Sequence, residues 1–232
     1  MTMVKICGIR TEPALDAAIE AGADYVGLVH FAKSPRHVEI PAAAALALRA
    51  REQGIAKVVV LLVDPDDALV DRVVAEIKPH ILQLHGAETL ERVTQIGARS
   101  DLEIMKAVKV ATHADVEASL PYLEPGIRAD ILLFDAMPPK TPDALPGGNG
   151  LAFDWRILEA VSARIPFALA GGLTPDNVGE AIQLTGAAIV DVSSGVESAP
   201  GEKDIGLIRR FLQAAKGAKQ SPDFNGPTGV EA

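Results

Sequence analysis

The sequence is short of cysteine, of basic residues and of long apolar runs. Its 232 residues include a single cysteine, Cys7, so no disulfide can form within the chain. The apolar runs end well before the roughly 20 residues that a membrane-spanning helix needs, and residues 1–5 show no basic segment ahead of a long apolar stretch. Lysine and arginine number 22 against 31 acidic residues, which argues against a surface that neutralises nucleic-acid phosphates. We therefore expect a cytoplasmic protein that binds neither membrane nor nucleic acid.

What the sequence does contain is a regular alternation of short β-branched runs with longer stretches rich in Ala, Leu and Glu at helical spacing. About eight such units of roughly 30 residues match a (β/α)8 TIM barrel, with parallel strands inside and helices outside, better than a doubly wound sheet. The predicted strands are 4–7, 25–30, 57–63, 81–85, 103–108, 130–135, 167–170 and 188–192. The predicted helices are 12–21, 41–53, 66–76, 88–97, 113–120, 154–163, 174–184 and 203–216.

A single α/β barrel domain over residues 1–216 accounts for these units, and two stretches depart from their regular spacing. Residues 136–150 are rich in Pro and Gly and too long for an ordinary connection. They follow the sixth predicted strand, where we expect a mobile substrate loop. Residues 217–232 have little apolar content and are predicted to form a disordered C-terminal tail.

Polar residues near the ends of four predicted strands share one direction, because side chains alternate along a strand. In the first strand this alternation directs Lys5 and Cys7 into the barrel. The same pattern directs His85, Asp135 and Asp191 inward from the fourth, sixth and eighth strands. The carboxyl ends of the strands form the catalytic face of a (β/α)8 barrel, so we expect these side chains to meet at a site there.

Each candidate also has a structural interpretation. A lone cysteine is more often an inert small hydrophobe than a reactive group, although Cys7 is placed at a strand end, where Lys5 would stabilise its thiolate. Asp135 alone could cap a loop. His85 alone could be a hydrogen-bonded residue at the end of a strand, and the basic segment 33–37 could be an exposed charged loop.

Glycine-containing turns follow the last two predicted strands. One contains Gly171 and Gly172, and the other contains Ser193, Ser194 and Gly195. In (β/α)8 barrels the loops after strands seven and eight often bind phosphate through backbone N–H groups. Either turn alone is also compatible with a simple tight connection. Together, at these two places, they favour a small phosphorylated substrate.

Motifs spread over nearly the whole chain carry a resemblance to a known family. They are V-K-I-C-G-I at 4–9, S-P-R at 34–36, L-Q-L-H-G at 82–86, L-L-F-D at 132–135, F-D-W at 153–155, A-G-G-L-T-P-D-N-V at 170–178 and D-V-S-S-G-V-E at 191–197. In this order they resemble the phosphoribosylanthranilate isomerases of tryptophan biosynthesis. Residues 147–152 depart from the G-G-T-G-like sequence expected before Phe153. This difference bears on the details of the loop that precedes Phe153 and leaves the resemblance to the family unchanged.

The resemblance implies an Amadori rearrangement of N-(5-phosphoribosyl)anthranilate to 1-(2-carboxyphenylamino)-1-deoxyribulose 5-phosphate, without a metal or an organic cofactor. Asp135 corresponds to the general acid that protonates the ring oxygen and opens the furanose. Cys7 corresponds to the base that removes the C2 proton. The chemistry needs a protonated acid and a base on one small sugar, so we expect the Asp135 carboxyl to be partly withdrawn from water.

The same resemblance assigns binding roles. Arg36 corresponds to the residue that holds the anthranilate carboxylate, for which a planar guanidinium is suited. Asp191 corresponds to a position near the sugar hydroxyls, and we expect His85 beside the substrate as well. The residues expected in the phosphate-binding turns are Gly171, Gly172, Ser193, Ser194 and Gly195. Members are similar in fold as monomers and as homodimers, and we expect one of these two states.

Three other hypotheses are weighed against this one. Sugar-phosphate isomerases of histidine biosynthesis, and bifunctional relatives, are expected to carry an aspartate at the position of Cys7. A barrel that only binds a phosphorylated ligand or a partner protein would not need Cys7 and Asp135 together. A metal site that combines Cys7 with His30 or His85 lacks the short paired ligand spacing of zinc sites.

Overall fold

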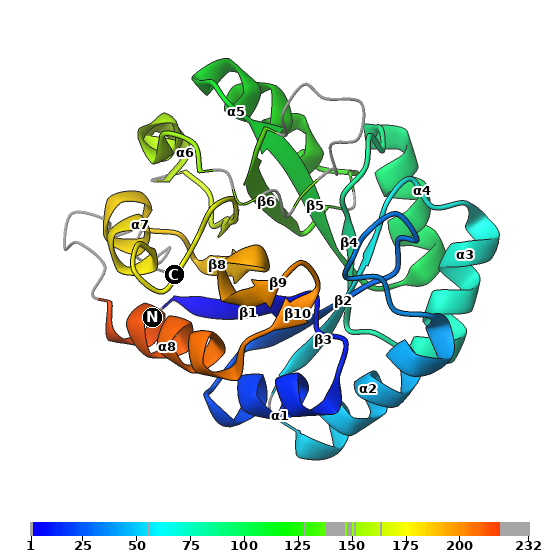
Figure 1. Ribbon diagram of the computed structural model, residues 1–232. Helices are drawn as coiled ribbons and strands as arrows, with labels where there is room; N and C mark the ends of the chain where they lie inside the picture. Colours follow the sequence, from blue (N-terminus) through cyan, green and yellow to red (C-terminus); the bar gives the residue numbers. More distant parts are fainter. Residues whose placement is uncertain are drawn as a thin grey trace, which may run out of the picture.

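Eight parallel strands form a closed barrel in the computed structural model of the chain (Figure 1). The structure describes residues 2–54, 56–127, 129–137, 147, 150, 152–162 and 164–218. The barrel strands are β1 (Met3–Cys7), β2 (Tyr25–Val29), β3 (Lys57–Leu62), β4 (Ile81–Leu84), β5 (Glu103–Val110), β6 (Ile131–Ala136), β7 (Ala168–Leu169) and β8 (Ile189–Val192). Each strand pairs with the next one along the chain, and β8 pairs with β1. The predicted (β/α)8 barrel is therefore confirmed.

Helices surround the barrel on its outer side (Figure 1). They are α1 (Glu12–Glu20), α2 (Ile40–Gln53), α3 (Asp67–Arg72) with the π-helical turn Val73–Ile77, α4 (Leu90–Ser100), α5 (His113–Ser119) with the 3-10 turn Leu120–Leu123, the 3-10 turn Trp155–Leu158 with α6 (Glu159–Ser162), α7 (Val178–Thr185) and α8 (Ile205–Gly217). Side-chain caps fix several helix starts: Asp66, Thr89 and Asp204 each accept a hydrogen bond from a backbone N–H of the first turn.

Alternation along the strands divides the buried apolar side chains into two layers. The layer inside the barrel consists of Tyr25, Val59, Ile81, Met105, Ala107, Leu133, Ala168, Ala170 and Ile189. Strand residues of the opposite parity, such as Leu82, Phe134 and Val190, belong to a larger layer that packs under the helices. The inward and outward directions predicted for β1, β4, β6 and β8 are therefore confirmed, and they decide which side chains reach the site.

Several helices begin later than the sequence predicts, and α7 and α8 bear on the site. Helix α7 begins at Val178 rather than at residue 174, because Asn177 Oδ1 accepts a hydrogen bond from Thr174 N at 2.8 Å and closes a turn there. Helix α8 begins at Ile205 rather than at residue 203, because Lys203 belongs to a hairpin that the sequence did not predict. In this hairpin, β9 (Glu197–Ala199) pairs antiparallel with β10 (Glu202–Lys203). The hairpin occupies the connection between β8 and α8.

Two sequence predictions fall largely outside the described residues. Of the predicted loop 136–150, the structure describes residues 136, 137, 147 and 150. Of the predicted tail 217–232, it describes residues 217 and 218, and Gly217 is the last residue of α8. Within the described ranges, no helix is both long enough and apolar enough to span a bilayer.

A substitution at Phe134 tests how the apolar side chains pack between the strands and the helices. Phe134 is fully buried, and its ring centroid lies 5.3 Å from that of Phe167 at an interplanar angle of 68°. We expect Phe134→Ala to lower the free energy of unfolding by about 3–5 kcal/mol, because burial is lost and a cavity remains. Leu48→Ala, at a side chain that is 53% exposed, is the control and should cost less than about 0.5 kcal/mol. Urea unfolding measures both values, and equal losses would contradict this packing.

Candidate active site

A cavity opens at the carboxyl ends of the strands. Cys7 at the end of β1, Asp135 from β6 and Asp191 from β8 line the cavity. His85, which follows β4, and Arg36, from the connection between β2 and α2, line it as well. The structure thus brings together these five side chains predicted from the sequence.

The Cys7 thiol lies beside a buried ion pair. Lys5 Nζ is 3.0 Å from both carboxylate oxygens of Asp191, and Lys5 is fully buried. Burial opposes the charge on Lys5, but Asp191 and Cys7 together raise the pKa of Lys5, which stays an ammonium. Burial also raises the pKa of the Cys7 thiol, whereas Lys5 lowers it and Asp191 raises it. Lys5 therefore favours the thiolate, as the sequence suggested, but withdrawal from water outweighs this effect and the net shift of the Cys7 pKa is upward.

Asp135 is nearly buried at the end of β6, at 5% exposure. Its Oδ1 accepts a hydrogen bond from Ala136 N at 2.8 Å, and its Oδ2 lies 3.2 Å from His85 Nε2. On the other side of the His85 ring, Nδ1 lies 3.1 Å from Gln83 Nε2. The carboxyl is therefore withdrawn from water as expected. One of its oxygens serves a local turn, and the other faces His85.

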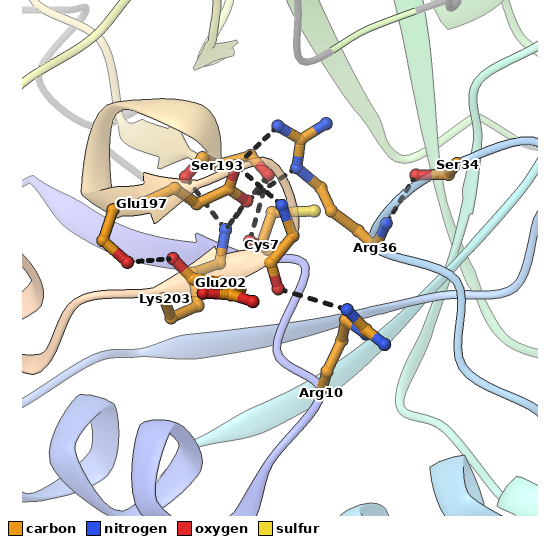
Figure 2. Close-up of polar contacts among 10 residues, drawn as sticks. Cys7, Arg10, Ser34, Arg36, Ser193, Glu197, Glu202 and Lys203 are labelled. Carbon is orange, nitrogen blue, oxygen red and sulfur yellow. Dashed lines mark hydrogen bonds and ion pairs between the residues drawn. The ribbon is translucent and has the colours of Figure 1, made fainter.

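Arg36 is 6% exposed, so the exposed-loop interpretation is wrong for this residue. Its Nε and Nη2 donate to the two carboxylate oxygens of Glu197 at 2.7 and 2.8 Å. Lys203 Nζ donates to Glu197 Oε1 at 2.7 Å and to Ser193 O at 2.9 Å, as Figure 2 shows. Burial raises the pKa of Glu197, but Arg36 and Lys203 outweigh this effect and hold that pKa below its usual value. The carboxylate therefore stays charged between two cations.

Sequence reasoning missed Glu197 and Lys203 as parts of the site. Glu197 is the last residue of the motif D-V-S-S-G-V-E, so the motif marked it as a candidate. The motif did not indicate which side chain Glu197 contacts. Lys203 was placed in a helix, although it lies on β10 with its side chain buried. The link between the two residues depends on the hairpin, and two short strands of this kind leave little trace in the sequence.

The two predicted phosphate turns contact one another. Four of their residues line the cavity: Gly171, Gly172, Ser193 and Ser194. Gly171 and Gly172 have φ angles of 87° and 64°, which glycine adopts without strain. Gly195 does not line the cavity, but a Cβ on it would lie 1.9 Å from Leu173 O. Glycine at this position therefore lets the second turn pass close against the first.

One group of described side chains has the composition of a metal site, and it lies outside the cavity lining. The group is His30, His37 and Glu39, whose candidate ligand atoms lie within 4.8 Å of one another. Glu39 is 77% exposed on its side chain and pairs with His37 at 3.1 Å. His30 Nδ1 lies 2.9 Å from Val38 O. Neither Cys7 nor His85 belongs to the group, so it gives no support to the metal site weighed from the sequence.

Comparison with known proteins decides the family. The family model described as N-(5'-phosphoribosyl)anthranilate (PRA) isomerase matches residues 4–214 of the chain. The chain belongs to this family. It is 54% identical over 216 residues to the N-(5'-phosphoribosyl)anthranilate isomerase of Paramagnetospirillum magneticum, covering 93% of this chain and 98% of that protein. It is 55% identical over 212 residues to the isomerase of Paracoccus denitrificans, covering 91% and 96%.

Solved structures of phosphoribosylanthranilate isomerases share the fold of the chain. The crystal structure from Thermotoga maritima superposes with a TM-score of 0.82 at 33% identity and covers 94% of this chain and 100% of that one. A second isomerase structure holds reduced 1-(o-carboxyphenylamino)-1-deoxyribulose 5-phosphate. It superposes with a TM-score of 0.80 at 32% identity, with the same coverage of 94% and 100%.

Membership of the phosphoribosylanthranilate isomerase family makes the chain an isomerase of tryptophan biosynthesis. The expected reaction class, an aldose-to-ketose rearrangement of N-(5-phosphoribosyl)anthranilate, is confirmed by this assignment. The histidine-biosynthesis and binding-only hypotheses are wrong for this chain. The family assignment names the reaction, and the residues that carry it out are a separate question.

The raised pKa of Cys7 can be tested by titration of its thiol, because the chain contains one cysteine. Ultraviolet absorbance of the thiolate, with the absorbance of Cys7→Ser subtracted, reports this one group. We expect its titration midpoint in the folded protein to lie above that of the same thiol in the urea-unfolded chain. Because the folded-state pKa is the higher one, the stability that this thiol contributes is present below the unfolded pKa and is lost as pH rises through the folded pKa. A folded midpoint below the unfolded one would show that Lys5 outweighs burial.

Proposed function

We propose that the chain isomerises N-(5-phosphoribosyl)anthranilate with Asp135 as the general acid and Cys7 as the general base. The observation that carries this assignment is that both side chains line one cavity while being only 5% and 4% exposed. They reach it from β6 and β1, two strands that are not neighbours in the barrel. A proton donor and a proton acceptor at separate places around one small sugar are the two groups that the rearrangement needs.

Asp135 acts first in this proposal. It gives its proton to the furanose ring oxygen, the bond between that oxygen and C1 breaks, and the lone pair of the anthranilate nitrogen forms the C1=N bond of a Schiff base. Asp135 is left as a carboxylate. His85 Nε2, 3.2 Å from Asp135 Oδ2, is placed to stabilise that negative charge.

Cys7 acts on the open-chain Schiff base. Its thiolate takes the proton from C2, the electrons of the C2–H bond form the C1=C2 bond, and the electron pair of the C=N bond returns to nitrogen. The resulting enolamine gains a proton at C1 and loses the proton of the C2 hydroxyl, which gives the ketone. Because burial raises the pKa of Cys7, the thiolate is a minority species at neutral pH, and Lys5 limits the cost of forming it.

Two anchors at opposite ends of the substrate would align C2 with Cys7. In this proposal Arg36 binds the anthranilate carboxylate, and the turns with Gly171, Gly172, Ser193 and Ser194 bind the phosphate. Their place in the cavity lining supports these roles, as does the complex of a structurally similar isomerase with a carboxylated and phosphorylated compound. When both ends of the substrate are bound, its reacting atoms are already placed beside Asp135 and Cys7 for the proton transfers.

Further parts of the sequence prediction belong to the same proposal. Asp191 and His85 both line the cavity, which supports a place for Asp191 near the sugar hydroxyls and for His85 beside the substrate. The chain acts in the cytoplasm, as a monomer or a homodimer. The single cysteine fits a reducing compartment, where disulfides are rare.

Substitution of the two catalytic residues tests the mechanism. We expect Cys7→Ala and Asp135→Asn each to lower kcat by about 10²- to 10⁴-fold, the usual contribution of a general acid or base. Asp176→Asn, at a side chain that is 83% exposed, is the matched control and should retain the wild-type rate. The measurement is turnover of N-(5-phosphoribosyl)anthranilate followed by the fluorescence of its anthranilate group. Unimpaired rates in Cys7→Ala and Asp135→Asn would rule out the proposed roles.

A further inference from the structure

The hairpin of β9 and β10 places two oppositely charged side chains in a buried position against Arg36 and Ser193, two residues of the cavity lining. The side chains of Glu197 and Lys203 are 4% and 2% exposed. Glu197 receives hydrogen bonds from Arg36 and Lys203, and its Oε2 also accepts one from Gly201 N at 3.2 Å. Figure 2 shows these side chains converging beside Ser193 and Cys7. Neither Glu197 nor Lys203 has a part in the acid–base chemistry proposed above.

Glu197 determines how the guanidinium of Arg36 is oriented. Two donors of the planar fork, Nε and Nη2, lie on the two oxygens of one carboxylate, so the plane and the rotation of the fork are fixed together. Glycine at position 8 leaves room for the stem of Arg36 in this orientation, because a Cβ there would lie 2.9 Å from Arg36 Cδ. A long side chain ordered before the ligand arrives loses less entropy on binding.

Lys203 supplies the charge balance that this arrangement needs. Arg36, Glu197 and Lys203 are two cations and one anion, so the buried group retains a net positive charge that attracts a carboxylate. Burial lowers the pKa of Lys203, and Glu197 is the largest influence that opposes this. Lys203 Nζ also donates to Ser193 O at 2.9 Å, and Ser193 Oγ donates to Cys7 O at 3.2 Å. Lys203 therefore links Arg36 to the second phosphate turn and to the strand end that carries Cys7.

We propose that Glu197, supported by Lys203, is a positioning residue that presents Arg36 to the carboxylate of the substrate. It acts through Arg36 and does not touch the reacting atoms. The inference rests on the proposed function, in which Arg36 binds the anthranilate carboxylate. It predicts that Glu197 governs how strongly the enzyme prefers a carboxylated substrate. A purely structural ion pair would affect stability without affecting that preference.

The experiment compares kcat/KM for N-(5-phosphoribosyl)anthranilate with kcat/KM for N-(5-phosphoribosyl)aniline, which lacks the carboxylate. The ratio of the two values is the carboxylate preference of an enzyme. The variants are Arg36→Met, Glu197→Gln and Lys203→Met, all in the full chain. Glu202→Gln is the matched control, because it makes the same change at an exposed position of the same hairpin. Circular dichroism and the urea midpoint report the folded state of each variant.

We expect Arg36→Met to abolish the preference and Glu197→Gln to reduce it by about 10-fold or more, through a higher KM for the carboxylated substrate. Lys203→Met should reduce it in the same direction, and Glu202→Gln should leave it unchanged. Glu197→Asp, which retains the charge, should recover part of the preference. If Arg36→Met abolishes the preference but Glu197→Gln retains it, the positioning role is wrong while the role of Arg36 stands. If Arg36→Met retains the preference, the proposed carboxylate site itself is wrong.

Should Glu197→Gln fail to fold, Lys203→Met and Glu197→Asp carry the same test. Each leaves a carboxylate near Arg36 but alters the contacts that hold it. A wild-type preference in both of these variants would overturn the proposal, and a graded loss that follows KM rather than kcat would support it.

Discussion

Closure of the eight strands forces alternate side chains into a single interior, and the site depends on this constraint. Below the mouth of the barrel, the inward positions are filled by apolar residues such as Ile81, Leu133 and Ile189. Further along the strands with the same parity, at the carboxyl ends, the inward positions carry His85, Asp135 and related polar groups that line the cavity. A shift of one residue in a strand would exchange its cavity group for an apolar one.

Burial gives the polar groups their chemical character. Two networks of charged side chains flank the cavity: Lys5 with Asp191, and Arg36 with Glu197 and Lys203. Each keeps cations charged where solvent is excluded, because a carboxylate lies within hydrogen-bond distance. Cys7 lies close to both networks without a carboxylate of its own, and burial therefore decides the direction of its pKa shift. The proposed base is thus scarce at neutral pH but strong when it forms.

The barrel, its strands and the inward direction of Cys7, Asp135 and Asp191 were predictable because periodicity and parity are local properties of the sequence. The hairpin of β9 and β10 was not predictable, since its strands are short and carry no apolar alternation. For the same reason the contact of Glu197 with Arg36, 161 positions apart, had no local signal. The net direction of the Cys7 pKa shift also required the structure, because sequence shows that Lys5 is near but not how deeply the thiol is buried.

The central claim is that Asp135 and Cys7 act in successive steps, one opening the ring and the other removing the C2 proton. The most direct test is the deuterium isotope effect on kcat for substrate labelled at C2, measured in Asp135→Asn and in Cys7→Ser. In Asp135→Asn ring opening limits the rate, so we predict no isotope effect. In Cys7→Ser proton removal limits the rate, so we predict a full primary effect. The reverse pattern, or equal effects in the two variants, would contradict the division of roles between these residues.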